Sequence, residues 1–331
     1  MMREDEIRKY LTEVPLDELL GEALEVKKKV FGEDIYIRGL IEVSNYCTQD
    51  CYYCGIRASS HAERYRLSDE DIYSAAREGY EAGFRTFVMQ GGEDPAFTDD
   101  RLVRLISTLK EKYPDVAITL SLGERSYESY KKLFDAGADR FLLRHETINE
   151  EHFSKLHPPY QELKTRVEAL ENLKDIGYQT GCGVMVGSPY QTLDNLIEDL
   201  LFIQEFKPHM VGIGPFIPHK DTPFKDFPPG DLERTLRMVA ITRLLLPEVL
   251  LPATTALATL DPKGRELGLQ AGANVIMPNL SPIESRKKYT LYDGKAITGG
   301  EAYESLVQLK EELKTLGHRI VTSRGDHPEK G

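Results

Sequence analysis

Short β-rich runs alternate with amphipathic stretches of helical length along most of the chain, and this alternation limits the possible folds most strongly. The strand candidates are residues 36–43, 86–90, 117–121, 140–144, 180–186, 210–213, 251–254 and 275–277. The main helix candidates between them are residues 68–82, 99–112, 126–136, 161–176, 192–206, 231–246 and 262–270. Eight β/α units predict a TIM-type (β/α)8 barrel, with its chemistry at the carboxyl ends of the strands. An open, doubly wound sheet is the alternative.

Helix boundary signals support the same pattern. Ser68, with Asp71 three residues later, is typical of a helix start. Helical stretches end just before a strand at Ala-Gly or Ile-Gly pairs, whose glycines are Gly83, Gly137, Gly177 and Gly272. We interpret the chain as a single domain with N-terminal helices in residues 1–34, a barrel core in 35–292, and a C-terminal helix and tail in 293–331.

Composition excludes several classes of partner. The 331 residues carry a net charge of -12, and their basic residues are scattered among acidic ones, so a nucleic-acid partner is not expected. No run of eighteen apolar residues suggests a membrane span, and the charged N-terminus is not followed by an apolar signal segment. With 40% hydrophobic residues the chain can bury a large core, and we expect a cytoplasmic protein.

Three of the four cysteines lie close together, directly after the first predicted strand. Their spacing is Cys47-x3-Cys51-x2-Cys54, which indicates one metal centre rather than the spread disulfides of a secreted protein. A structural zinc site would need a fourth ligand, and Cys182 and His61 are isolated in the sequence. Three thiolates on a cube-shaped iron-sulfur cluster would instead leave one iron open.

Charged side chains alternate with apolar ones in the predicted strands. In the run from Arg140 to Glu146, Phe141 and Leu143 share the face expected to meet helices, so Arg140, Arg144 and Glu146 face the barrel interior or its rim. Arg38 and Thr119 occupy similar positions in other strands. A structural network of arginine and glutamate is one reading. The other is a cavity for a small substrate with carboxylate or other anionic groups.

The cysteine spacing, with Tyr53 before the last cysteine, resembles that of radical S-adenosylmethionine enzymes. The Gly91-Gly92-Glu93 run after the second strand stands where that family carries a similar run. The resemblance implies a [4Fe-4S] cluster whose open iron chelates S-adenosyl-L-methionine. One-electron reduction would then yield a 5′-deoxyadenosyl radical.

Longer segments, among them "EVSNYCTQDCYYCG", "DRFLLRHET" and "PATTALATLDPKGRELGLQAGANVIMPN", resemble the HydE family of [FeFe]-hydrogenase maturases over about residues 35–292. The resemblance implies that the cluster ligands are Cys47, Cys51 and Cys54. It implies contacts with S-adenosylmethionine for Tyr53, Gly91, Gly92, Glu93, Glu146, Arg166, Gly183 and Gly187. It implies a substrate pocket where catalysis takes place, formed by Arg38, Gln90, Thr119, Arg140, Arg144, Thr254, Thr255, Met277 and Tyr289.

The same resemblance implies a substrate and partners. HydE proteins act on a small cysteine-bound iron complex carrying CO and cyanide, made by HydG, and their product passes towards HydF. The segment after Tyr292 contains no cysteine, so no second cluster is expected. A methylornithine synthase-like mutase, a biotin synthase-like sulfur-insertion enzyme and a non-catalytic iron-sulfur carrier are alternatives. Thr254 and Thr255 could also be helix caps, and Met277 a core residue.

Overall fold

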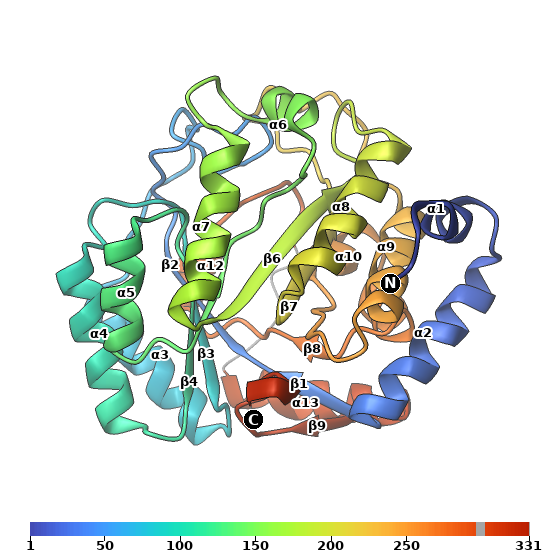
Figure 1. The fold of residues 1–331 in the computed structure, drawn as a ribbon. Coiled ribbons are helices and arrows are strands. Elements are labelled where there is room, and N and C mark those ends of the chain that lie inside the picture. The colour runs from blue at the N-terminus through green and yellow to red at the C-terminus, as the bar shows by residue number, and fades with distance from the viewer. Residues whose placement is uncertain (296–301, 331) are drawn as a thin grey trace.

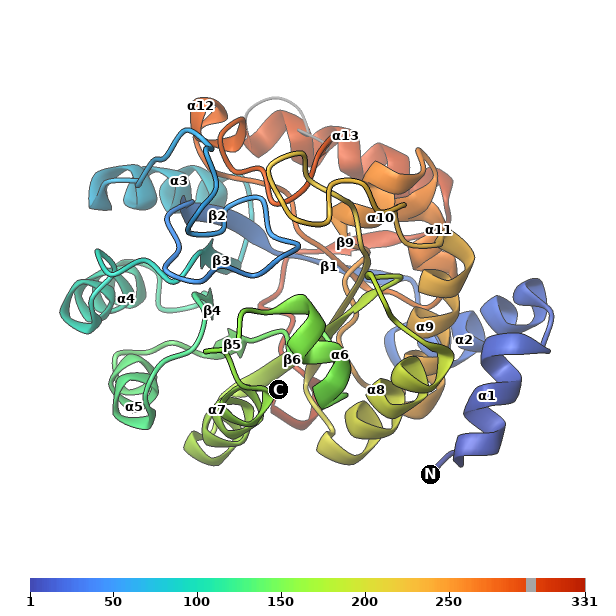
Figure 2. The same ribbon diagram turned by 90° about the horizontal axis from the view of Figure 1, so that it is seen from above.

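Parallel strands form the centre of the molecule and helices surround them, as the views from the side and from above show (Figure 1, Figure 2). The computed structural model describes residues 1–295 and 302–330, and side chains of the second range from Leu306 onward. One sheet has the order β2-β3-β4-β5-β6-β7, with β2 Gly39–Ser44, β3 Thr86–Gly91, β4 Ala117–Ser121, β5 Arg140–Leu142, β6 Gln179–Val186 and β7 Met210–Pro215. A second sheet has the order β8-β1-β9, with β1 Asp34–Ile37, β8 Val275–Ile276 and β9 Arg319–Val321.

The two sheets close into one barrel. The first predicted strand is interrupted at Arg38, so its first half, β1, pairs with β8 and its second half, β2, pairs with β3. On the other side, isolated parallel bridges join Met210 to Leu250 and Pro252 to Val275, which connects β7 to β8. The predicted (β/α)8 barrel is therefore confirmed, with the segment 250–252 at the seventh position.

The strand predicted at residues 251–254 is wrong in its extent, because this segment makes bridges only. Pro252 has no backbone N–H to donate to a neighbouring strand. Thr254 already caps the next helix, since its hydroxyl accepts a hydrogen bond from the backbone N–H of Leu257 at 3.4 Å. The alternative reading of Thr254 as a helix cap is therefore correct.

The helices largely follow the predicted pattern. The N-terminal extension contains α1 Glu4–Thr12 and α2 Leu16–Phe31, and the outer helices are α3 Asp69–Glu81, α4 Asp99–Lys112, α5 Tyr127–Asp135, α7 Leu163–Ile176, α8 Leu193–Phe206, α9 Leu232–Leu245, α11 Gly264–Gln270 and α13 Ala302–Thr315. The short helices α6 Glu150–Leu156, α10 Thr255–Leu260 and α12 Ile283–Arg286 and the 3-10 turn Pro328–Lys330 were not predicted. None of the helices in the described ranges is long and apolar enough to cross a membrane. The cytoplasmic location stays a prediction.

The four predicted glycine stops are confirmed. Each of these glycines follows its helix directly or after one capping residue, and each has a left-handed backbone conformation. The φ value is 104° at Gly83, 110° at Gly137 and Gly177, and 95° at Gly272. A residue with a Cβ atom would be strained at such a φ. These glycines turn the chain from an outer helix back towards the amino end of the next strand.

The C-terminal segment folds back under the barrel and binds Arg140 (Figure 1). Arg140 donates to the carboxylate of Asp326 at 2.6 Å, to the carbonyl oxygen of Arg324 at 2.7 Å, and to the hydroxyl of Thr86 at 3.0 Å. Its Nε donates to the side-chain oxygen of Gln179 at 3.2 Å. Since Thr86 and Gln179 begin β3 and β6, Arg140 lies at the amino end of the barrel.

The prediction that Arg140 lines the substrate pocket is therefore corrected. Strand alternation did point its side chain inward, and Phe141 packs outward against Tyr130 at a ring separation of 5.0 Å. A strand position alone does not say which end of the barrel a long side chain reaches. The carboxylate that neutralises Arg140 comes from the predicted tail 293–331, of which residues 296–301 lie outside the described residues. For Arg140, the structural-network reading holds.

Removing this carboxylate should destabilise the fold. In the Asp326→Ala variant the buried guanidinium of Arg140 loses its counter-charge, and we expect the free energy of unfolding to fall by about 3 kcal/mol or more. Urea unfolding of the anaerobic, fully loaded protein would measure it. Asp194→Ala is the control, because it breaks the exposed pair with Arg8 and should lower the free energy of unfolding far less. Equal losses in the two variants would contradict the assignment.

Candidate active site

A cavity of about 270 Å³ opens at the carboxyl ends of the strands, at the opposite end of the barrel from Arg140. Residues from the strand ends form its floor, including Gln90, Ser121, Leu142, Met185 and Pro215. The loop after β2 supplies the three clustered cysteines to its wall. The predicted position of the site at this end of the barrel therefore agrees with the structure.

Hydrogen bonds within the cysteine loop hold it in place. Arg57 forms a two-point ion pair with Asp50 inside the loop. Arg64 donates to the backbone carbonyls of Asn45, Ile56 and Arg57, so one side chain ties several turns of the loop together. A guanidinium is well suited to this task because its donors point in fixed directions. The loop therefore presents its sulfur atoms in a fixed arrangement.

All of the cysteines are free thiols, and burial opposes ionisation of the clustered ones. Burial raises the pKa of Cys51 to about 11, and it also raises the pKa values of Cys47 and Cys54. Thiols with such pKa values are poor nucleophiles at neutral pH. Binding of a metal centre, which takes cysteine as the thiolate, is therefore a more suitable role for these residues than nucleophilic catalysis. Cys182 lies in the core on β6, away from this loop.

The separation of the sulfurs argues against a single zinc ion. Three cysteines around one zinc would have sulfur atoms about 4 Å apart, given Zn–S bonds of about 2.3 Å. Within the described residues, a group of three potential ligand atoms within 4.8 Å of one another is formed by His209, His327 and Glu329. The sulfur atoms of the three clustered cysteines do not all lie within that distance of one another. A cubane cluster holds its ligands on separate irons and suits wider spacing. The donor set therefore fits a three-cysteine [4Fe-4S] cluster.

The group at His209 and His327 does not suit a metal. The Nδ1 atom of His209 accepts from the backbone N–H of Thr180 at 3.0 Å, and that of His327 accepts from the backbone N–H of Glu329 at 3.3 Å. In a neutral histidine the proton then sits on Nε2, so neither Nε2 offers a lone pair. These residues belong to the packing at the amino end of the barrel.

The glycine-rich run after β3 packs directly against the cysteine loop. A Cβ atom on Gly92 would lie 2.3 Å from the carbonyl oxygen of Tyr46 and 2.6 Å from the Cβ of Cys47, so only glycine fits. The backbone N–H of Glu93 then points at the sulfur of Cys47, 3.4 Å away. The Glu93 carboxylate accepts from the side-chain amide of Gln49 at 2.6 Å and from the backbone N–H of Glu124 at 3.0 Å. Glu93 is therefore fixed beside the cluster loop.

Two further acidic groups are fixed by arginines. Glu146 follows β5 with a left-handed backbone, φ 65°, which is uncommon for a residue other than glycine. Its backbone N–H donates to the carbonyl of Gly183, and its carboxylate lies 3.0 Å from Nη2 of Arg144. Arg166 on α7 pairs with Glu124 and donates to the Arg144 carbonyl at 2.7 Å. Burial opposes the charge of Arg166, but Glu124 and nearby phenol and thiol groups raise its pKa overall.

Tyr53 is positioned by His157. The Nδ1 of His157 lies 2.9 Å from the carbonyl of Phe153 and must donate to it, so its Nε2 accepts from the Tyr53 hydroxyl at 3.2 Å. Burial lowers the pKa of His157 to about 3, which keeps it neutral. The Tyr53 side chain is therefore held in place on the cavity wall, which Cys51 and Cys54 also line.

Most of the predicted site residues meet in this cavity. Besides the cysteines, its lining includes Tyr53, Gly91, Gly92, Glu93, Glu146 and Arg166 from the predicted cosubstrate set and Gln90, Arg144 and Tyr289 from the predicted substrate set. Gly183 and Gly187 are not in the lining. They allow close packing, since a Cβ on Gly183 would lie 2.3 Å from the Gly212 carbonyl and one on Gly187 would lie 2.4 Å from the Cα of Gly230. The individual roles stay predictions.

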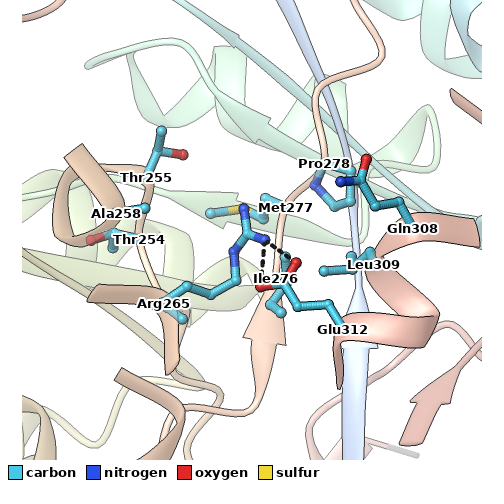
Figure 3. A pocket seen from close by; sticks show the side chains of 11 residues that line it. Thr254, Thr255, Ala258, Arg265, Ile276, Met277, Pro278, Gln308, Leu309 and Glu312 are labelled. Carbon is cyan, nitrogen blue, oxygen red and sulfur yellow. Dashed lines mark hydrogen bonds and ion pairs between the residues drawn. The ribbon is translucent and has the colours of Figure 1, made fainter. Parts of the chain in front are cut away.

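Other predicted residues lie elsewhere. Thr254, Thr255 and Met277 line a second cavity of about 290 Å³ between α10, α11 and α13, where Arg265 and Glu312 face each other at 3.2 Å (Figure 3). Arg38 and Thr119 are buried inside the barrel and do not line the first cavity. Their assignment to the substrate set rests on the family resemblance and on their inward direction in the strands, and neither gives their depth in the barrel.

Several residues of the first cavity were not predicted, including Gln49, Met185, Phe216 and Tyr292. Gln49 could have been found, because it lies between Cys47 and Cys51 in the sequence. Met185 and Phe216 carry no signal beyond their apolar character, which is equally typical of core residues.

Comparisons with known proteins agree with this geometry. Residues 41–203 match the model of the radical SAM superfamily. The chain is 48% identical to the [FeFe] hydrogenase maturase subunit HydE of Thermotoga maritima over 272 residues, which cover 82% of this chain and 77% of that protein. The chain belongs to the HydE family. It is therefore a radical S-adenosylmethionine enzyme, a class that works with a [4Fe-4S] cluster and S-adenosylmethionine.

Relatives of the HydE family share the fold. The chain is 30% identical to 3-methylornithine synthase of Methanosarcina acetivorans, over 87% of this chain and 83% of that protein. A crystal structure of methylornithine synthase superposes with a TM-score of 0.83 and 25% identity, covering 97% of this chain and 94% of the other. A structure of the maturase HydG has a TM-score of 0.80, with 22% identity over 97% of this chain and 73% of the other, and supports the fold alone.

The contact between Gly123 and Glu93 allows a direct test of the site. A Cβ atom on Gly123 would lie 2.0 Å from Cγ of Glu93, so Gly123→Ala must displace this carboxylate. We expect S-adenosylmethionine to bind the cluster-loaded variant about tenfold more weakly or worse, equal to about 1.4 kcal/mol.

Gly177→Ala is the matched control for this variant. Gly177 also has a positive φ, but its added Cβ would meet only Cζ of Phe134 at 3.5 Å. Both variants carry a backbone penalty of roughly 1 to 2 kcal/mol. Equilibrium binding should show a loss of affinity in Gly123→Ala alone, and equal affinities would show that Glu93 does not contact the cosubstrate.

Proposed function

We propose that this enzyme matures [FeFe]-hydrogenase, as its relative from Thermotoga maritima is named to do. The supporting observation is the cavity in which three free cysteines, without a fourth cysteine or histidine ligand beside them in the described residues, face fixed acidic and basic groups. In this proposal Cys47, Cys51 and Cys54 hold a [4Fe-4S] cluster. When bound, that cluster supplies the electron that splits S-adenosylmethionine into methionine and a 5′-deoxyadenosyl radical.

The protein's own side chains would bind the cosubstrate. Glu93 and Glu146 place carboxylates in the cavity where an ammonium group or ribose hydroxyls can be bound. Gly91 and Gly92 let the backbone approach closely, and Arg166 offsets the negative charge of the acidic groups. Tyr53 would pack against the adenosyl part.

The basic groups inside the barrel favour an anionic substrate. Arg144 keeps its Nε without a hydrogen-bond partner among the described residues, although Nη2 binds the Val184 carbonyl and Glu146. Deeper in the barrel, the Nε and Nη2 atoms of Arg38 and the hydroxyl of Thr119 also lack partners in the described part of the chain. Buried donors of this kind are costly unless a ligand satisfies them. A small iron complex carrying CO, cyanide and a cysteine carboxylate would satisfy the donor of Arg144, which lines the cavity.

The partners follow from this assignment. The substrate would be the organometallic product of HydG, which is itself a maturase of the [FeFe]-hydrogenase, and the product would pass towards HydF. The second candidate function is that of 3-methylornithine synthase, which the 30% identity favours over other radical enzymes. Maturation of apo-hydrogenase in the presence and absence of this protein distinguishes the two. Formation of 3-methylornithine without any effect on maturation would overturn the proposal.

The cluster ligands can be tested with two cysteine variants. Cys51→Ala should lose most of the iron and acid-labile sulfide after anaerobic reconstitution, because two sulfurs hold a cubane poorly. It should form no 5′-deoxyadenosine above background with dithionite and S-adenosylmethionine. Cys182→Ala is the control, since this buried thiol lies in the core and should leave iron content and turnover unchanged. Loss of iron in both variants would contradict the assignment.

The role of Arg144 can be separated from that of the cluster. Arg144→Lys keeps the positive charge beside Glu146 but loses the planar fork that can bind a carboxylate at two points. We expect normal iron content and normal uncoupled 5′-deoxyadenosine formation, with maturation of apo-hydrogenase reduced about tenfold or more. Arg125→Lys serves as the control, because Arg125 binds Asp99 and the Phe97 carbonyl outside the cavity. Unchanged maturation in Arg144→Lys would remove this residue from the substrate site.

A further inference from the structure

A row of polar side chains connects the cavity to one of the cluster cysteines. The side-chain amide of Gln49 donates to the carboxylate of Glu93 at 2.6 Å, and the amide of Gln161 donates to the Gln49 side-chain oxygen at 2.6 Å. The same Gln161 nitrogen lies 3.6 Å from the sulfur of Cys51. The row therefore runs from Glu93 through Gln49 and Gln161 to Cys51.

The carboxylate at one end determines the orientation of both amides. An ionised carboxylate only accepts hydrogen bonds, so Gln49 must turn its nitrogen towards Glu93 and its oxygen towards Gln161. Gln161 must then present its own nitrogen to Gln49. A primary amide nitrogen carries two hydrogens, and one of them is used by Gln49. The second faces the sulfur of Cys51.

This second hydrogen matters once Cys51 is a cluster ligand. A thiol can itself donate, and the Cys51 thiol lies 3.5 Å from the Gln161 side-chain oxygen. An iron-bound thiolate has no proton and can only accept, so the bond from the Gln161 nitrogen is the one that remains. Hydrogen bonds to the cysteine sulfurs of iron-sulfur clusters change their reduction potentials, because they stabilise the additional negative charge of the reduced state.

Gln161 is half-buried and held in place by its backbone, whose N–H donates to the Pro158 carbonyl at 2.9 Å. It lies 110 residues from Cys51 in the sequence, between α6 and α7. We propose that Gln161 is a positioning residue that raises the reduction potential of the cluster by donating to the Cys51 sulfur, and that Gln49 and Glu93 fix its orientation. This proposal rests on the proposed cluster at Cys47, Cys51 and Cys54.

The test is a redox titration of the reconstituted enzyme, followed by the electron paramagnetic resonance signal of the reduced cluster. Gln161→Leu keeps the size of the side chain and removes the donor. At the midpoint potential of the wild type, its ratio of reduced to oxidised cluster should fall about fivefold, the effect of losing one ordinary hydrogen bond. Gln161→Glu should fall at least as far, since a carboxylate accepts only and adds negative charge.

Gln204→Leu is the matched control. Gln204 is a buried glutamine whose side chain makes two hydrogen bonds, both to the backbone of Met2, and it lies on α8 away from the cavity lining. Its cluster should titrate like the wild type. A midpoint in Gln161→Leu equal to that of the wild type overturns the proposal while leaving the cluster assignment intact.

Two further outcomes are informative. If Gln161→Leu does not assemble a cluster, Gln49→Leu decides, because it leaves Gln161 in place but removes the group that orients its amide. A lowered midpoint in Gln49→Leu supports the proposal, and an unchanged one overturns it. If the wild type itself gives no signal of a reduced [4Fe-4S] cluster, the proposed function fails first, and the two failures are thereby distinguished.

Discussion

Charged side chains buried in the barrel need partners, and this requirement organises the rest of the structure. At the amino end, Arg140 is neutralised by Asp326 from a segment that folds back under the strands. At the carboxyl end, Arg144 and Arg166 are paired with Glu146 and Glu124 but remain next to a cavity. A buried charge without a partner would cost several kcal/mol. The pairing therefore makes one end of the barrel a closed packing layer and leaves the other for chemistry.

The fold was largely predictable because its signals are local. The period of the strands and helices, the caps and the glycine stops each depend on a few neighbouring residues, and α4 has the predicted bounds of Asp99–Lys112. The prediction of a strand at residues 251–254 was wrong because Pro252 lacks a backbone N–H and Thr254 caps the next helix, although the composition of the segment is apolar. Strand β9 was missed because its pairing with β1 joins residues that are 285 positions apart, such as Asp34 and Arg319.

The site was predictable where its residues belong to short sequence patterns. The clustered cysteines and the glycine-rich run are short patterns, and both line the cavity. Strand alternation correctly predicts that residues such as Arg38 point into the barrel. It does not predict how deep in the barrel they lie, because depth depends on how far each strand extends. Gln161 carries no pattern at all: its contact with Cys51 exists only because the segment before α7 passes over the cysteine loop.

The division of the first strand at Arg38 has a consequence for folding. Residues of its second half, β2, pair with residues of β3 that lie 47 or 48 positions later, such as Phe87 with Gly39. Both neighbours of its first half, β8 and β9, are formed by residues beyond 270. Contacts that close such long loops form slowly. The half that carries the cysteine loop can therefore pair early during synthesis, while the opposite rim of the barrel assembles last.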